Sequence, residues 1–223
     1  HPLTRRRIGL LIEGHVQSSF MTIAQVEKFY SAFYPRWKKD AYYGLMEKLH
    51  VAPRQPISRM SCGQRSQVTL GLILAQDPDL LVLDDFSMGL DPGYRRLFID
   101  YLKEYAKAES KTVFLTSHII SDMERLIDDC ILMDYGRILI QTPVKDLLER
   151  LRRYDFTTRG DAPPFADDPG IYHPGVIRSR GELFSFEGRA YVESYLHRCG
   201  IAFEGLREES VCLEDAFIGL TGK

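Results

Sequence analysis

The chain has 223 residues, of which 44% are apolar and 27% are charged, and its formal net charge is −2. This length and composition allow one or two globular domains with a sizeable core, and the lack of a basic excess argues against a nucleic-acid partner. No apolar run approaches the roughly 20 residues of a membrane-spanning helix.

The cysteines and the first residues bear on the compartment. The four cysteines lie far apart and form no Cys-x-x-Cys pair, so we expect reduced thiols in a cytosolic protein rather than a zinc or redox site. The sequence begins with His1, and the three arginines at 5–7 are not followed by the apolar core of a signal peptide. We therefore expect a fragment, or a chain whose beginning lies upstream.

The first part of the chain predicts one strand and three helices. Residues 8–12 are apolar enough for a buried strand, and residues 22–50 have helical spacing that is broken at Pro35, which predicts two helices. A mostly buried helix is predicted to follow the small polar residues 58–64 and to end at 77–79.

The next segment predicts a parallel sheet. Residues 80–83 are a short apolar run typical of a central strand, and residues 111–116 repeat it after a helix at 94–108. This order implies a right-handed crossover in an α/β sheet. A hairpin at 131–140, on the edge of the sheet, and a helix at 143–151 should follow.

Composition changes after residue 154, because glycine and proline are frequent up to residue 175. We predict a domain boundary there, between residues 1–154 and a small α+β domain at 155–223. The segments of this second domain with recognisable spacing are a strand at 183–186 and helices at 189–198 and 213–220.

Two acids follow the central strand. Asp84 and Asp85 stand at the carboxyl end of that strand, which is where α/β proteins bind ligands. One carboxylate can hold a magnesium ion, directly or through water, and its neighbour can orient or deprotonate an attacking water. Taken alone, the pair is also consistent with an acid that simply caps a turn.

Two other polar groups are equally ambiguous when taken alone. Ser61, Gly63 and Gln64 offer a phosphate a hydroxyl, an approachable backbone and the positive end of a helix dipole, although an ordinary N-cap has the same residue types. His118 follows the strand at 111–116 and should lie beside the two acids, where a neutral imidazole can contact a phosphate and a water. A lone histidine at a strand end is more often a surface residue.

The order of these motifs within about sixty residues resembles one family. Residues 60–64 resemble the signature motif of the nucleotide-binding subunits of ABC transporters, 80–84 their Walker B strand, 89–91 their D-loop, and His118 their switch histidine. The resemblance covers residues 8 to about 150. It implies a P-loop NTPase-like α/β fold, with a helical subdomain at about 14–77 that docks on a membrane subunit.

Other segments extend the resemblance. Residues 8–13 are similar to the strand and start of the Q-loop, with Glu13 at a position where many members carry Gln. Residues 30–37 and the ending 213–223 resemble the exporter branch, which pairs with ABC-2 type permeases.

Three departures from the family pattern bear on activity. The phosphate-binding (Walker A) loop Gly-x-x-x-x-Gly-Lys-Ser/Thr occurs nowhere in these residues, so the domain lacks its N-terminal part and the chain alone should be inactive. Asp85 replaces the usual glutamate base, and a misplacement of about 1 Å can cost roughly a hundredfold in rate. Cys62 replaces a glycine or lysine. We therefore expect slow hydrolysis in the complete protein.

The resemblance also implies a function and its partners. Two copies, or two related ATPase subunits, would sandwich two Mg-ATP molecules on the cytoplasmic face of the cell membrane and drive a separate permease that exports a substrate. Asp84 would hold Mg²⁺, Asp85 would position water and His118 would steady the γ-phosphate. The residues implied to contact nucleotide or relay its state are Ser61, Gly63, Gln64, Asp91 and Glu13.

Two other functions stay open. The first is a regulatory subunit that hydrolyses ATP weakly or not at all, which Asp85 and the missing loop both permit. The second is a soluble ABC-fold ATPase that acts on ribosomes or chromosomes. Against the second, such proteins carry two domains in tandem or a long coiled coil, and neither is present between Glu13 and Ser61.

Overall fold

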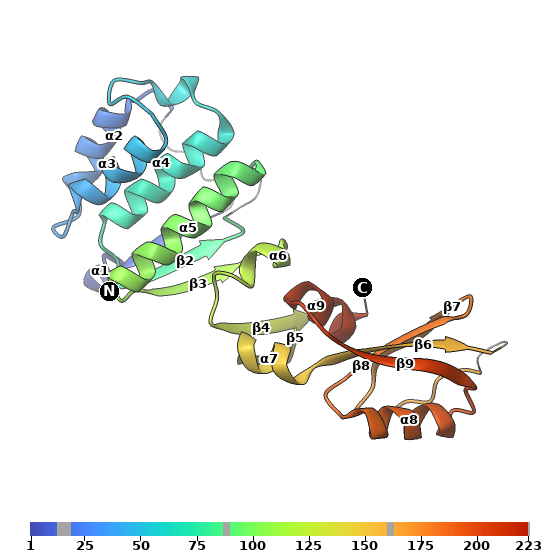
Figure 1. Cartoon of the computed structure of the whole chain (residues 1–223). Helices are drawn as coiled ribbons and strands as arrows, with labels where there is room; N and C mark the ends of the chain where they lie inside the picture. Colours follow the sequence, from blue (N-terminus) through green and yellow to red (C-terminus); the bar gives the residue numbers. More distant parts are fainter. Residues whose placement is uncertain (13–18, 87–89, 160–162, 223) are drawn as a thin grey trace. The chain divides into compact units, whose positions relative to one another are not determined.

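The computed structural model describes residues 1–12, 19–86, 90–159 and 163–222. They form two compact units, His1–Asp122 and Met123–Lys223. The elements of the first unit (Figure 1) are α1 (Pro2–Arg5), β1 (Ile8–Leu11), α2 (Ile23–Ser31), α3 (Lys39–Lys48), the 3-10 helix η1 (Ile57–Arg59), α4 (Cys62–Ala75), β2 (Leu80–Asp84), α5 (Pro92–Ala108), β3 (Thr112–Thr116) and α6 (Ile120–Met123). Those of the second are β4 (Asp129–Asp134), β5 (Arg137–Pro143), α7 (Val144–Arg150), β6 (Arg152–Thr158), β7 (Tyr172–Ile177), β8 (Arg180–Ser185), α8 (Arg189–Arg198), β9 (Phe203–Ser210) and α9 (Leu213–Thr221).

The sheet of the first unit is parallel, in the order β1-β2-β3, as its short apolar runs predicted. Leu10 lies opposite Val82, and Val82 lies opposite Phe114. The strands alternate, so Leu81 and Leu83 are fully buried on one face. On the other face Leu10 and Phe114 keep 51% and 53% of their surface exposed.

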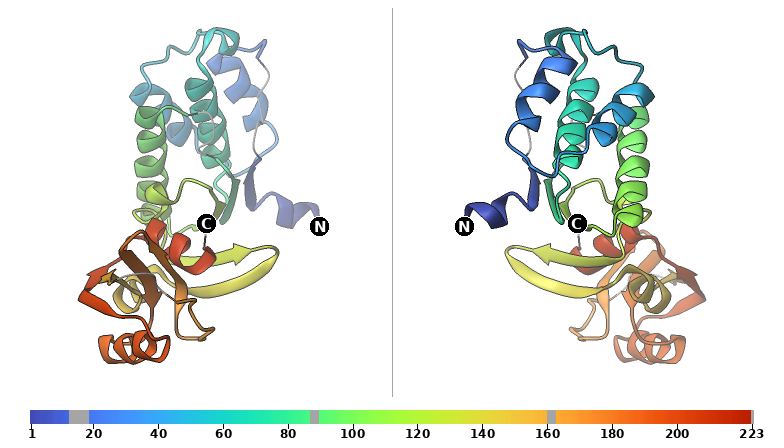
Figure 2. Two further views of the ribbon diagram at one scale, coloured as in Figure 1. Left: turned by 90° about the vertical axis from the view of Figure 1, so that its right-hand side faces the viewer. Right: turned by 90° about the vertical axis from the view of Figure 1, so that its left-hand side faces the viewer.

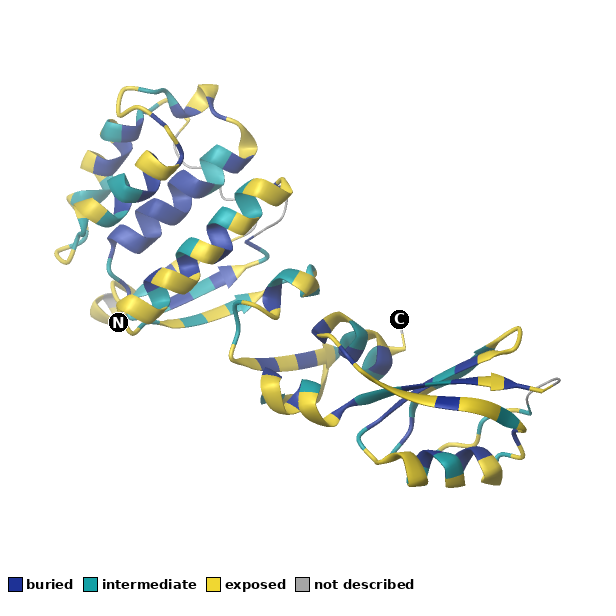
Figure 3. Ribbon diagram, viewed as in Figure 1, coloured by how far each residue is buried: buried dark blue, intermediate teal, exposed yellow. Residues whose placement is uncertain are grey.

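Helix α4 is the centre of the first unit. Every residue from 67 to 75 is buried, and the helix is dark along most of its length in Figure 3. A helix that is apolar on all sides belongs in a core; α5 lies beside it (Figure 1 and Figure 2). Gly9 is needed where β1 meets α4, because a Cβ atom there would lie 2.6 Å from Ile73 Cγ2.

A network of charged side chains ties the amino ends of the sheet strands to the helices. Asp77, just after α4, accepts a hydrogen bond from Lys111 Nζ at 2.5 Å and another from Arg36 Nε at 3.0 Å, and Lys38 Nζ lies 3.3 Å away. Asp79 pairs with Arg36 and with Arg7. Lys111 is only 8% exposed and Asp77 14%, so this pair is shielded from water.

The second unit contains two antiparallel sheets. The predicted hairpin is present as β4 and β5, whose turn places Tyr135 and Gly136 at φ +42° and +76°, as a two-residue hairpin turn requires. This hairpin was expected on the edge of the parallel sheet; that prediction is wrong, because β4 and β5 form a two-stranded sheet of their own.

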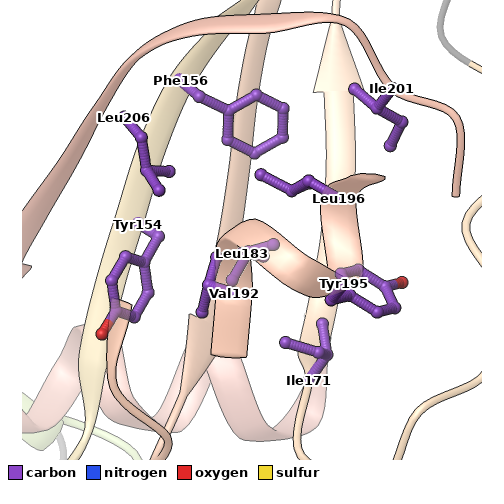
Figure 4. Close-up of a cluster of buried hydrophobic side chains, with 9 residues drawn as sticks. All are labelled: Tyr154, Phe156, Ile171, Leu183, Val192, Tyr195, Leu196, Ile201 and Leu206. Atoms are coloured by element: carbon purple, nitrogen blue, oxygen red, sulfur yellow. The ribbon is translucent and has the colours of Figure 1, made fainter. Parts of the chain in front are cut away.

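The larger sheet has the order β7-β8-β6-β9. Helix α8 packs on one face of it through Val192, Tyr195 and Leu196, which join Tyr154 and Leu183 of the sheet in one core (Figure 4). Neighbouring strand residues point to opposite faces, so Phe184 faces the other way. There it packs against α9, where a Cβ atom on Gly219 would lie 2.5 Å from Phe184 Cγ.

The division into units differs from the boundary predicted from composition. Residue 154 lies inside β6, and the chain passes from the first compact unit to the second after Asp122. Helix α7 packs against α9 within the second unit. The extent of the ATPase-type domain, predicted as residues 1–154, stays a prediction.

Lys111→Met is expected to lower the free energy of unfolding of the full-length protein at pH 7 by about 2 kcal/mol, because it leaves a shielded carboxylate with fewer partners. Burial raises the pKa of Asp77, but hydrogen bonds from Lys111 and Lys38 outweigh it and hold the pKa below its usual value. Arg36 and Arg7 lower the pKa of Asp79 to about 2.

A carboxyl group whose pKa is lowered by folding stabilises the folded protein at pH values above its unfolded pKa, which is about 4. This stabilisation is lost as the pH falls. The deficit of Lys111→Met should therefore shrink as the pH falls below about 4 in urea titrations. Lys107→Met, on the exposed side of α5, is the control. A deficit that stays constant with pH would contradict the assignment to Asp77.

Candidate functional site

Asp84 is held at the carboxyl edge of the sheet by its neighbour in β3. The two strands pair so that Asp84 lies opposite Thr116, and Thr116 Oγ1 donates a hydrogen bond to Asp84 Oδ1 at 2.6 Å. The same hydroxyl accepts a hydrogen bond from the backbone N–H of Asp85 at 3.0 Å. Thr116 thus fixes both acids. Nothing in the sequence marks Thr116 as a site residue, because a threonine at the end of a strand is ordinary.

Asp85 and His118 are in direct contact. His118 Nδ1 lies 3.0 Å from Asp85 Oδ1 and 2.9 Å from Oδ2. The backbone of Asp85 has φ +41°, a left-handed conformation that aspartate and asparagine tolerate better than most residues. The side chain of His118 is 61% exposed and that of Asp85 is 21% exposed. The imidazole ring is therefore the part of the pair that solvent reaches most easily. The structure therefore brings together the two residues that were predicted as catalytic.

Ser61 and Gln64 form a capping box at the start of α4. Ser61 Oγ accepts a hydrogen bond from Gln64 N at 3.2 Å, and Gln64 Oε1 accepts one from Ser61 N at 3.1 Å. Both side chains therefore form hydrogen bonds with backbone N–H groups at the start of the same helix. In the part of the chain that the structure describes, the N–H groups of Cys62 and Gly63 make no hydrogen bond. These two donors are what the helix end offers to an anion.

Asp91 and Gly63 serve the packing of the same region. Asp91 is the N-cap of α5, and its Oδ1 accepts hydrogen bonds from Gly93 N at 3.0 Å and Tyr94 N at 3.1 Å. Gly63 is buried against the Tyr94 ring, since a Cβ atom there would lie 2.8 Å from Tyr94 Cδ2. The predicted signature and D-loop residues therefore meet at Tyr94.

The predicted residues form two groups. Asp84, Asp85 and His118 lie at the carboxyl edge of the sheet, whereas Ser61, Gly63, Gln64 and Asp91 lie at the starts of α4 and α5. Within residues 19–86 and 90–159, no hydrogen bond between side chains joins one group to the other. Glu13 lies outside the described residues, as does Gly89 of the predicted D-loop.

The carboxylates suit a magnesium ion that arrives with a nucleotide. Magnesium keeps several waters and is commonly bound through one or two carboxylates together with phosphate oxygens. Asp84 is exposed, and its Oδ1 is already oriented by Thr116. Among the described residues, no three His, Cys, Asp or Glu side chains are grouped to hold a metal by themselves. Asp84 therefore has the chemistry and the exposure to bind an ion that phosphate oxygens also hold.

Comparison with known sequences gives a family match and several similar proteins. A family described as "AAA domain, putative AbiEii toxin, Type IV TA system" matches residues 46–121. The Nod factor export ATP-binding protein I of Burkholderia pseudomallei (strain 1710b) is 29% identical over 189 residues, which cover 79% of this chain and 58% of that protein. The energy-coupling factor transporter ATP-binding protein EcfA2 of Staphylococcus aureus (strain MRSA252) is 37% identical over 91 residues, which cover 41% and 32%. The chain thus spans between about a third and three fifths of the length of these relatives.

Two solved structures share the fold. One, described as an ATP binding subunit of an ABC transporter, has a TM-score of 0.56 and 20% identity over 65% of this chain and 62% of its own. The other is cbiO1 from Clostridium perfringens, part of the ABC transporter complex cbiONQ, with a TM-score of 0.54 and 22% identity over 65% and 60%. The predicted ABC ATPase fold and the resemblance to ATP-binding subunits are confirmed.

Gly63→Ala is expected to destabilise the full-length protein by about 1–3 kcal/mol, because the new methyl group overlaps the Tyr94 ring. Chemical unfolding of Gly63→Ala, Tyr94→Ala and the double variant measures this. The alanine should cost less when the ring is absent. Gly44→Ala, whose Cβ atom would meet nothing closer than 4.0 Å, should lose no stability; an equal loss in both variants would contradict the contact.

Thr116→Val is expected to lower the free energy of unfolding by about 1–2 kcal/mol, because it removes a hydroxyl that both donates and accepts a hydrogen bond. Chemical unfolding measures this. Thr112→Val, in the same strand and exposed, is the matched control. If both variants unfold alike, Thr116 does not hold the two acids.

Proposed function

Since the chain is a relative of the ATP-binding subunits of ABC transporters, we propose that the protein binds and hydrolyses ATP and couples this to export through a separate membrane permease. The observation that carries the proposal is the contact of Asp85 with His118 beside Asp84, at the carboxyl edge of a parallel sheet. This is the edge at which such sheets bind ligands.

We propose a different task for each side chain of this edge. When bound, Mg²⁺ neutralises charge that develops on the phosphates, and Asp84 is the carboxylate that would hold it. Asp85 would orient and deprotonate the attacking water. If His118 donates Nδ1–H to the Asp85 carboxylate, its Nε2 is turned outward and can contact a phosphate oxygen or the water.

The contact also bears on rate. His118 Nδ1 lies within 3.0 Å of both oxygens of Asp85, so the carboxylate must share its lone pairs between the imidazole and the water. It is also one methylene shorter than a glutamate. Both features support slow hydrolysis in the complete protein.

The second group of residues supports a dimer. The start of α4 offers the N–H groups of Cys62 and Gly63, which make no hydrogen bond within the described residues, together with the positive end of the helix dipole. This combination suits a phosphate. Ser61 and Gln64 keep this end in shape through the capping box. We place the γ-phosphate of the partner's nucleotide there, with Asp91 at the same interface and Glu13 relaying the nucleotide state to the permease.

The membrane partner and the location are part of the proposal. Within the described residues, none of the helices combines the length and the apolar character needed to cross a bilayer. By analogy with the transporter subunits that it resembles, we propose that the protein meets the bilayer through its permease, on the cytoplasmic face. Residues 1–223 contain no Gly-x-x-x-x-Gly-Lys-Ser/Thr loop, so we expect ATP turnover to need residues outside this stretch.

A second candidate function is a regulatory subunit that binds ATP and does not hydrolyse it. Asp85 in the place of a glutamate, already in contact with His118, favours it. An active ATPase subunit would then have to stand beside this one.

Asp85→Asn is expected to lower magnesium-dependent ATP turnover of the full-length protein by about a hundredfold or more, because the amide cannot take a proton from water. Asparagine tolerates the left-handed backbone at this position, so folding and ATP binding should persist. Asp85→Glu should raise the turnover. The matched control is Asp100→Asn on the exposed side of α5.

Equal turnover by the wild type and Asp85→Asn would show that Asp85 is not the base. ATP binding without turnover in all the variants, wild type included, would instead support the regulatory subunit.

A further inference from the structure

The start of α5 is fastened to α4 by one residue outside the predicted motifs. Gln67 Nε2 donates a hydrogen bond to the backbone oxygen of Tyr94 at 3.0 Å. Gln67 lies one turn after Gly63, the residue that packs against the Tyr94 ring. One ring contact and one hydrogen bond therefore join the first two turns of α4 to the first turn of α5.

The burial of Gln67 shows that core packing alone does not explain it. The residue is 0% exposed, and its Oε1 has no hydrogen-bond partner among the described residues. A buried acceptor without a partner is destabilising, and an apolar side chain of this length would fill the space without it. What the amide adds is the bond to Tyr94.

The first turn of α5 makes further polar interactions with its surroundings. Asp91 Oδ1 accepts a hydrogen bond from Tyr94 N at 3.1 Å, so the cap and the bond from Gln67 hold the two backbone polar groups of the same residue. The next residue, Arg95, places Nε 2.8 Å from Asp122 Oδ2. Asp122 lies in α6, four residues after His118.

We infer that Gln67 is a positioning residue that locks the start of α4 to the first turn of α5, so that Ser61 and Asp91 move as one body. The consequence rests on the proposed function: in a dimer that closes on ATP, the helix end and the D-loop would reach the partner together. Loosening Gln67 would let each of them approach separately.

Hydrogen exchange of the full-length protein tests the lock without any need for activity. Gln67→Met keeps the length and burial of the side chain but removes the donor. It should speed the exchange of the amides at 64–67 and 93–97 by about fivefold or more, because both helix starts lose a constraint. Thr69→Val is the matched control: Thr69 is also buried, but its hydroxyl bonds to Arg65 O within α4. Unchanged exchange in Gln67→Met would overturn the inference.

A double-mutant cycle in ATP turnover tests the joint movement. Ser61→Ala and Asp91→Ala should interact by about fivefold in kcat/KM when Gln67 is present, and by less than about twofold in the Gln67→Met background. Additive effects in both backgrounds would overturn the joint movement. If the wild type has no ATP turnover, the proposed function fails, and the exchange measurement still decides whether Gln67 fastens the two helices.

Discussion

The pairing register of β2 with β3 is the constraint on which the candidate site depends. The register is unbroken from Leu80 opposite Thr112 to Asp84 opposite Thr116. The Thr116 hydroxyl and the Asp84 carboxylate therefore lie on the same face and at the same edge of the sheet. Because side chains alternate along a strand, a slip of one residue would turn Asp84 to the helix face and Leu83 away from it. Leu81 and Leu83 are fully buried on the opposite face, and this burial fixes the register. The core of the unit thereby sets the geometry of its edge.

The first unit could be predicted from the sequence because its signals are regular. Short apolar runs between polar turns gave the parallel strands, and the apolar residues of α2, α3 and α5 recur with helical spacing. Most of the second unit's main sheet could not be predicted. Strand β9 carries four charged residues and buries only Leu206, while β7 contains Pro174 and Gly175; neither has the alternation that marks a strand.

The candidate site, like the fold, could be predicted from the sequence only in part. Asp84, Asp85 and His118 could be identified because each lies at or just after the end of a recognisable strand, and because their order with the other motifs resembles one family. The contacts made by Thr116 and Gln67 could not be predicted, because threonine at a strand end and glutamine in a helix are ordinary residue types. Gly63 was singled out for the approach of a phosphate; the structure adds that the Tyr94 ring also requires a glycine there. Short motifs locate such residues, but only the fold shows which neighbours they need.

The exposed face of the parallel sheet has a practical consequence for work with these residues in isolation. Leu10, Val82 and Phe114 form one row across three strands, and the outer two are about half exposed. Parallel sheets are ordinarily covered on both faces, and contiguous apolar surface attracts other molecules of the same kind. The apparent molecular mass of these residues in isolation, measured by static light scattering, should therefore rise with protein concentration, and self-association would set the conditions under which they can be handled.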